Sequence, residues 1–102
     1  MSIINLTSDN FEKEVLHAAE PVLVEFQASW CGPCKAMAPV VEAVSAETSG
    51  VKFGKVDIDS EAELAGEFHV MSVPTLLLFR DGKPEKRSVG LQKKEDIMKL
   101  IH

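Results

Sequence analysis

Both cysteines of this chain lie in one short segment, Trp30-Cys31-Gly32-Pro33-Cys34-Lys35, which also holds the only tryptophan among the 102 residues. A thiolate can attack a disulfide sulfur, and a second thiol nearby can then displace the product and close a new disulfide. Two cysteines separated by two residues are close enough to share these roles. The chemistry that this segment offers is therefore thiol–disulfide exchange.

Two other uses of paired cysteines fit the chain less well. A zinc site needs two further ligands at a compatible spacing, and the three histidines, His17, His69 and His102, are scattered along the chain. A purely structural disulfide stabilises the folded state most when it closes a long loop, because it then restrains the unfolded chain most. Cys31 and Cys34 would close a very short loop. A redox-active pair is favoured over both, and no bound metal or cofactor is expected.

The dithiol is predicted to lie at a junction between a strand and a helix. The run Val22–Gln27 is almost wholly apolar and predicts a buried strand, and a helical apolar pattern follows from about Cys31 to about Glu47. In such a unit the first turn of the helix lies at the carboxyl edge of the strand, where α/β proteins place their functional sites.

The two cysteines are expected to differ in reactivity. At the helix tip, unpaired backbone N–H groups and the positive end of the helix dipole favour the thiolate of Cys31, and Lys35 adds a positive charge. Cys34 lies three residues further on, about 4.5 Å along the axis. We therefore predict that Cys31 is the nucleophile and that Cys34, less exposed, is the resolving thiol. Between them, Pro33 fixes the backbone and Gly32 leaves room for a partner chain.

Two neighbouring side chains have more than one interpretation. Glu25 interrupts the apolar strand, so it is either a surface acid or, as we predict, a half-buried base whose pKa is raised by desolvation and which takes the proton of Cys34. Trp30 stands in the loop just before the helix, where a core position and an exposed contact surface are equally compatible with the sequence.

The remaining elements follow from periodicity and turn residues. Further strands are expected at Ile3–Leu6, Val51–Ile58, Thr75–Arg80 and Pro84–Val89, and further helices after Thr7–Asn10, from Asp59 to about Phe68 and from about Lys93 to Ile101. Because Asp81-Gly82 is a tight-turn signal, the last two strands form a hairpin, whereas the first three need crossover connections. The prediction is one α/β domain over residues 1–102. Its mixed five-stranded sheet has three parallel strands plus the antiparallel C-terminal hairpin, flanked by four helices on both faces.

The long helix carries two further predictions. Its inward stripe is expected at Val40, Val41 and Val44, and Pro39 lies inside it. Because proline removes a backbone donor and crowds the preceding turn, a kink is expected near Lys35 and Ala36.

Charge and hydropathy exclude several classes of function. The net charge is −5, with 45% hydrophobic residues, which disfavours nucleic acid or an anionic membrane as a partner. The basic cluster between Arg80 and Arg87 is interleaved with acids and lacks aromatics, so a solvated hairpin is favoured there. No apolar run approaches the ~18 residues of a membrane span, and the N-terminal residues lack a secretory pattern, so a cytoplasmic location is expected.

The Trp30–Lys35 segment resembles the active-site motif of the thioredoxin family, and the resemblance extends over the whole chain. Val73-Pro74-Thr75 is similar to the loop in which that family has a cis-proline facing the dithiol. The family's other characteristic residues are matched by Pro39, Lys55, Gly82 and Gly90. The resemblance implies the thioredoxin fold, reduction of protein disulfides, and recycling of the oxidised form by a flavin-dependent thioredoxin reductase that uses NADPH. A monomer is expected.

Two positions depart from the family pattern. Thioredoxins usually carry aspartate where Glu25 stands and an aromatic where Gln27 stands. Protein disulfide isomerase domains share the glutamate, but they normally have histidine in place of Pro33. The Gly-Pro spacer therefore favours a reductant over an isomerase. Lys55 is expected to pair with Glu25, whose extra methylene brings the carboxyl either nearer Cys34 or nearer Lys55.

The resemblance also implies a docking surface for substrate chains. The residues expected to form it are Trp30, Met71, Val73, Pro74, Gly90 and Leu91. Backbone groups of Val73 would align a substrate by β-type hydrogen bonds, so side-chain selectivity is expected to be loose. A rival hypothesis uses the same surface without redox turnover, in a thioredoxin-fold accessory subunit.

Overall fold

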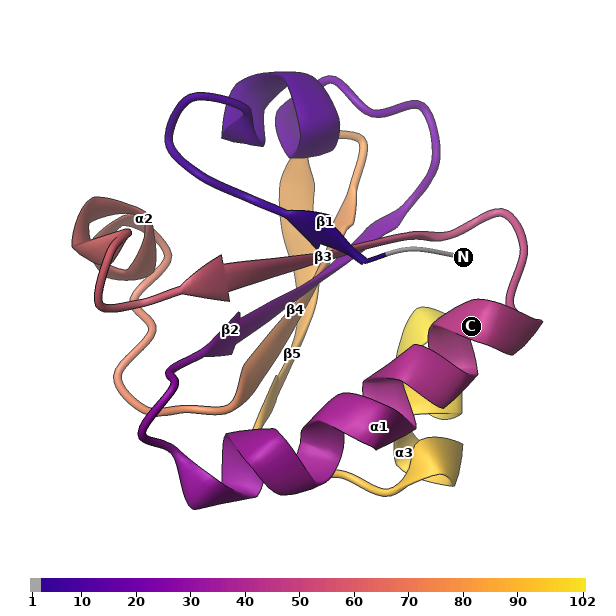
Figure 1. The fold of residues 1–102 in the computed structure, drawn as a ribbon. Helices are drawn as coiled ribbons and strands as arrows, with labels where there is room; N and C mark the ends of the chain where they lie inside the picture. The colour runs from indigo at the N-terminus through magenta and orange to yellow at the C-terminus, as the bar shows by residue number, and fades with distance from the viewer. Residues whose placement is uncertain (1–2) are drawn as a thin grey trace.

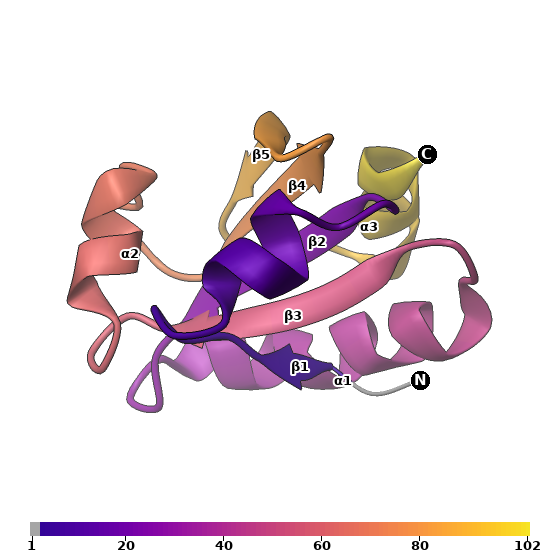
Figure 2. The ribbon, with the colours of Figure 1, turned by 90° about the horizontal axis from the view of Figure 1, so that it is seen from above.

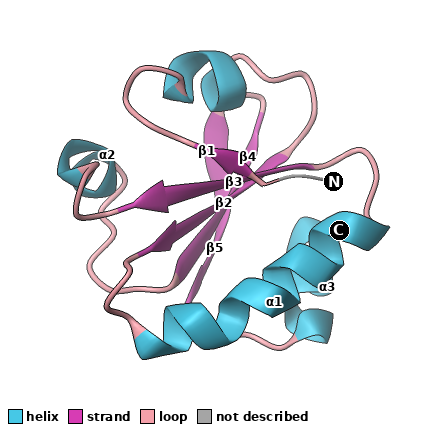
Figure 3. Ribbon diagram, in the orientation of Figure 1, coloured by secondary structure: helices cyan, strands magenta, loops and turns pink. Residues whose placement is uncertain are grey.

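The computed structural model describes residues 3–102 and contains a mixed sheet with helices on both of its faces (Figures 1 and 3). The strands are β1 (Ile4–Asn5), β2 (Val22–Gln27), β3 (Lys52–Asp57), β4 (Thr75–Arg80) and β5 (Lys83–Val89). The helices are η1 (Glu12–Leu16, a π-helix), α1 (Gly32–Glu47), α2 (Ala62–Glu67) and α3 (Lys94–Ile101). Every predicted element is present, with bounds shifted by a few residues.

The sheet has the strand order β1-β3-β2-β4-β5. β3 runs parallel to β1 and to β2, whereas β4 is antiparallel to β2 and forms a hairpin with β5. This confirms the predicted set of three parallel strands plus an antiparallel C-terminal hairpin. β2, the strand that leads into the cysteines, is central, and its residues pair with β3 on one side and β4 on the other.

Two layers of helices enclose the sheet. In Figure 2, η1 lies in front of the sheet and α1 lies behind it. Leu64 of α2 packs in the cluster with η1, and Ile97 of α3 packs in the cluster with α1, so η1 and α2 cover one face and α1 and α3 the other. Alternate residues of β2 point to opposite faces of the sheet. Val24 and Phe26 pack in the cluster with η1, whereas Leu23 packs in the cluster with α1 and α3. This double burial explains why apolar residues occur at both parities of the strand.

The inward stripe of α1 differs from the predicted one. Met37 is fully buried, as are Val41 and Val44, whereas Val40 is only half-buried at the margin of the cluster. The stripe begins at Cys34 and follows the helical period through Met37 and Val41, which leaves Val40 turned to one side. Pro39 lies inside α1, which is continuous through it. The kink near Lys35 stays a prediction.

The hairpin turn between β4 and β5 packs directly against the end of η1. Gly82 has φ +77°, a left-handed conformation, and a Cβ added there would lie 2.6 Å from the carbonyl oxygen of Leu16. Only glycine fits both demands, because it has no Cβ and adopts positive φ without strain. The turn is therefore fixed by a contact between residues far apart in the chain.

We expect Gly82→Ala to destabilise the fold by roughly 2 kcal/mol or more, since it adds both backbone strain and a clash with a carbonyl. Gly66→Ala is the matched control, because Gly66 lies within α2 and an added Cβ there has nothing within 4 Å. That control should be neutral or stabilising by about 0.5–1 kcal/mol. Urea unfolding of the two variants measures the difference, and equal effects would contradict the tight contact at the turn.

Candidate active site

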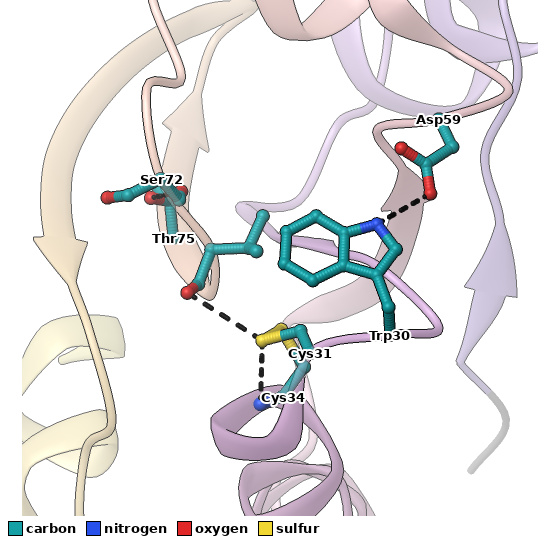
Figure 4. Close-up of a disulfide and its surroundings, with 7 residues drawn as sticks. Trp30, Cys31, Cys34, Asp59, Ser72 and Thr75 are labelled. Carbon is teal, nitrogen blue, oxygen red and sulfur yellow. Dashed lines mark hydrogen bonds between the residues drawn. A yellow bond between two sulfur atoms is a disulfide. The ribbon is translucent and has the colours of Figure 1, made fainter.

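The cysteine pair lies at the start of α1, just after the loop that follows β2. Cys31 is the N-cap of α1 in an extended conformation, Pro33 lies in the first turn, and Cys34 follows inside the helix. The two cysteines form a disulfide with a Cα–Cα distance of 5.2 Å (Figure 4). Pro33 is well suited to its position, because the first helical N–H groups have no partner within the helix and the proline ring fixes a helical φ.

The sulfur of Cys31 takes the part of a capping side chain. The backbone N–H of Cys34 donates to Cys31 Sγ over 3.1 Å, and the first turn of α1 contains no acidic residue. A negative charge on this sulfur would be stabilised by the same N–H group and by the positive end of the helix dipole. The geometry fits the predicted thiolate at Cys31.

Burial does not separate the two cysteines as expected from the sequence. Cys31 is 4% exposed and Cys34 is 3% exposed, so the predicted difference in exposure is absent. Both pack against Ala28, with Ile58 and Val73 beside them. Ile58 and Val73 come from other parts of the chain, and helix geometry alone gave no sign of them. The two sulfurs differ in their contacts instead, because Cys31 Sγ lies 3.7 Å from the carbonyl oxygen of Val73.

Trp30, which directly precedes Cys31, is exposed. Its side chain is 66% exposed, which decides between the two alternatives that the sequence left open. The indole Nε1–H donates to Asp59 Oδ2 over 2.9 Å, so the ring is held at its edge (Figure 4). Asp59 follows β3 and has no sequence pattern that links it to Trp30.

The loop before β4 brings Val73 to the site. The Val73–Pro74 peptide bond is cis, as the family resemblance implied. Thr75 Oγ1 donates to the carbonyl of Ser72 over 2.7 Å, and Gly90 N–H donates to the carbonyl of Pro74 over 2.8 Å. The loop is therefore tied to the start of β4 and to the residue that follows β5.

Arg87 holds the other end of this segment. Its guanidinium donates to the carbonyl oxygens of Phe68 and His69, at the carboxyl end of α2. These carbonyls have no partner within the helix, and His69 has a positive φ of 56°. Sequence analysis placed Arg87 in a solvated hairpin and missed this contact, because α2 and β5 meet only in the folded chain.

Four large apolar side chains of residues 3–102 are exposed, and each belongs to a segment that contributes to the site or pairs with one. They are Trp30, Met71, Val89 and Leu91. Val89 was not predicted, although an apolar residue directly before Gly90 in an otherwise polar strand is a signal for it. Val73 is half-buried and Pro74 is buried, so these two contribute backbone more than side chain. Gly32, Pro33 and Lys35 are exposed on the first turn of α1.

Glu25 lies in the middle of β2, on the sheet face that α1 covers. It is 5% exposed, and its register partners are Lys55 on β3 and Leu76 on β4. Desolvation by burial raises the pKa of Glu25 from its usual 4.5 to about 7, while Lys55 opposes the shift and Glu42 on α1 adds to it. The expected ion pair is absent among the contacts of residues 3–102, so Lys55, which is exposed, acts on Glu25 through space.

No cluster of three or more His, Cys, Asp or Glu side chains that could hold a metal ion occurs in the described part of the chain. None of the helices described here is long and apolar enough to span a membrane.

A central strand that delivers two cysteines to a helix N-terminus, opposite a cis-proline loop, defines a thioredoxin-fold protein with a redox-active disulfide. The family model for thioredoxin matches residues 2–102. The chain therefore belongs to the thioredoxin family, and it is a thiol–disulfide oxidoreductase that reduces protein disulfides.

Curated relatives agree with this assignment. The chain is 48% identical to a thioredoxin of Chlamydia trachomatis over 94% of its own length and 92% of the relative's. It is 44% identical to a thioredoxin of Mycobacterium tuberculosis, over 96% of its own length and 85% of the relative's. A bifunctional thioredoxin reductase/thioredoxin of Mycobacterium leprae is 43% identical over 94% of this chain, which covers 21% of that protein.

The buried carboxyl of Glu25 predicts a pH-dependent stability. Because its pKa is higher in the folded chain, the folded state holds the proton between pH 4.5 and about 7 while the unfolded state has lost it. Stability therefore falls as pH rises through this window and stays lower above it, by up to about 3 kcal/mol. Glu25→Gln should be more stable than the parent at pH 8 and nearly equal to it at pH 4.

Urea unfolding at both pH values measures this difference. Glu42→Gln is a useful comparison, because removing that negative charge should lower the pKa of Glu25 and narrow the window without touching the buried side chain. A Glu25→Gln variant whose stability gain is the same at both pH values would assign the effect to packing instead of ionisation.

Arg87 predicts a second measurable effect, on the loop that carries Val73. We expect Arg87→Met to lower the opening free energy of residues 69–73 by about 1 kcal/mol, because two carbonyl groups lose their charged donor. Amide hydrogen exchange measures this. Lys86→Met is the matched control, because it removes the same charge from the adjacent residue. An equal response from both variants would show that only net charge matters.

Proposed function

We propose that Cys31 is the nucleophile of this protein-disulfide reductase and that Cys34 is its resolving thiol. The observation that carries the assignment is the position of Cys31 Sγ at the N-cap of α1, where the Cys34 N–H donates to it over 3.1 Å. A thiolate at this position keeps that donor and the helix dipole. Cys34 is inside the helix, and its sulfur accepts no backbone N–H from residues 3–102.

The reaction takes two exchange steps. The Cys31 thiolate attacks one sulfur of a substrate disulfide, forming a mixed disulfide and releasing the other substrate sulfur as a thiolate. Cys34 then loses its proton and attacks Cys31 Sγ, which closes the Cys31–Cys34 disulfide and releases the second substrate thiol. Two electrons pass from the cysteine pair to the substrate, so no further redox group is required.

Glu25 is proposed as the acceptor of the Cys34 proton. Glu25 lies in β2 at the parity of Leu23, which packs in the cluster with α1, and Cys34 is buried in the first turn of α1. A pKa of about 7 lets the group accept a proton and return it near neutrality. Lys55, next to it in register, keeps that pKa from rising further. The second step should therefore slow when Glu25 is replaced by glutamine.

A substrate chain is proposed to bind across the exposed face around Cys31. Trp30, Met71 and Leu91 supply apolar contacts, and Val73, with Pro74 and Gly90 beside it, supplies backbone hydrogen bonds. Gly32, Pro33 and Lys35 complete the face on the side of the helix. Because most of these contacts are apolar or involve backbone, many unfolded or extended segments with a disulfide would fit.

The partners follow from the family and from the reaction. We propose that a flavin-dependent thioredoxin reductase returns electrons from NADPH to the Cys31–Cys34 disulfide, and that disulfide-containing proteins are the substrates. We further propose that residues 1–102 work as one thioredoxin domain, as a monomer, in the reducing environment of the cytoplasm. The Mycobacterium leprae relative, which combines both activities in one chain, supports this pairing.

The decisive experiment follows NADPH oxidation by a thioredoxin reductase in the presence of the chain and a disulfide-bonded protein. The intact chain should support turnover, and Cys31→Ser should abolish it. A chain that binds such proteins but shows no turnover would be an accessory subunit instead. A chain that reshuffles substrate disulfides faster than it reduces them would be an isomerase.

Trapping experiments distinguish the roles of the two thiols. Cys34→Ser should accumulate a stable mixed disulfide between substrate and Cys31, because the resolving thiol is missing. In the reduced parent protein, Cys31 should also react with an alkylating agent faster than Cys34 at neutral pH. Mass spectrometry of the trapped species identifies the bonded cysteine. A trapped species in Cys31→Ser instead of Cys34→Ser would reverse the assignment.

A further inference from the structure

One sulfur near the site has no part in the exchange reaction, the thioether of Met71. Its side chain is 92% exposed, the largest value among the exposed apolar side chains. The other methionines of the described residues are protected. Met37 is fully buried, and Met98 is partly buried, with its sulfur 4.0 Å from Thr48 Oγ1.

Met71 also stands at the edge of the docking surface. It begins the short segment that leads to Val73, whose carbonyl oxygen lies 3.7 Å from Cys31 Sγ. The other exposed large apolar residues belong to the same segments: Trp30 precedes Cys31, Val89 pairs with Thr75 next to Pro74, and Leu91 follows Gly90, whose N–H donates to the Pro74 carbonyl. An increase in the polarity of Met71 would therefore act where a substrate chain is desolvated.

We propose that Met71 is an oxidation site, at which a hydroperoxide converts the thioether to the sulfoxide and so weakens the binding of protein substrates. The oxygen is transferred from the peroxide to sulfur, the O–O bond breaks, and the peroxide is reduced to an alcohol or to water. The sulfur loses two electrons, and no other reactant is needed. This inference rests on the docking surface described under the proposed function.

The state of the cysteine pair determines when this reaction matters. With the disulfide closed, neither cysteine offers a thiol, and both residues are buried, at 4% and 3% exposure. Met71 is then the most accessible sulfur of the described chain. In the disulfide form, peroxide is therefore expected to oxidise Met71 before any other sulfur of the described residues.

The sulfoxide acts through desolvation. A thioether loses little when a substrate covers it, whereas the sulfoxide oxygen is a strong acceptor that must give up water. The change is chemically reversible, because sulfoxide reductases restore the thioether. Peroxide would then decrease substrate binding reversibly through Met71, while the dithiol stays intact.

The first test measures where oxidation occurs. The disulfide form is treated with limiting hydrogen peroxide, and peptide mapping follows the sulfoxide at each methionine separately. Met71 should be oxidised well before Met98 and Met37. Equal rates at Met71 and Met98 would overturn the proposed selectivity.

The second test measures the effect on function. After peroxide treatment the cysteine pair is reduced with dithiothreitol, and the reduction of a disulfide-bonded protein is measured. We expect KM to rise roughly five- to tenfold, with the alkylation rate of Cys31 unchanged, because the thiol itself is intact. Treatment with the two methionine sulfoxide reductases, one for each sulfoxide epimer, should restore KM. An unchanged KM at full Met71 oxidation would contradict the proposal that the sulfoxide weakens substrate binding.

Matched variants assign the effect to one sulfur. Each variant is compared with its own untreated sample: Met71→Leu should show no change in KM after peroxide, and Met98→Leu should retain the full response. Met71→Gln should raise KM without any peroxide. A response in Met71→Leu equal to the parent's would place the effect elsewhere. Failure of the untreated parent to reduce any disulfide would instead contradict the proposed function.

Discussion

The sulfur of Cys31 occupies the position that a serine or aspartate oxygen takes at many helix N-termini, and the site depends on this contact. One backbone N–H, that of Cys34, satisfies an unpaired helix donor and holds the sulfur in place. The contact requires β2 to end close to the tip of α1, with a tight connection between them. The central place of β2 in the sheet, buried on both faces, keeps that strand end from moving.

The buried carboxyl of Glu25, in the same strand, lowers the stability of the fold. A carboxyl in the layer between the sheet and α1 is desolvated, which raises its pKa to about 7 and lowers stability at higher pH. Large apolar clusters on both faces of the sheet offset this loss. An apolar residue at this position would stabilise the fold more, but it would leave no group beside α1 to accept a proton.

The exposed edge strand β5 positions the segment that carries Val73, which lies against Cys31. β5 is almost entirely exposed, yet Arg87 binds the end of α2 and the N–H of Gly90 binds the carbonyl of Pro74. These contacts hold the segment that carries Val73 at both of its ends. The edge strand therefore contributes little to the core but fixes a loop whose carbonyl oxygen lies against Cys31 Sγ. Its polar sequence gave no sign of this role.

The sequence by itself determined the redox pair and the strand and helix that carry it, and it favoured a half-buried position for Glu25, which the structure buries at 5% exposure. Each of these follows from spacing or periodicity within a few residues. Only the tertiary structure decided the burial of both cysteines, the Trp30–Asp59 bond, the missing ion pair of Lys55, and the full exposure of Met71 beside the site. The reason is distance along the chain: Val73 is 42 residues from Cys31, and Asp59 is 29 from Trp30. Local patterns specify how a segment folds, whereas such contacts depend on how several segments pack together.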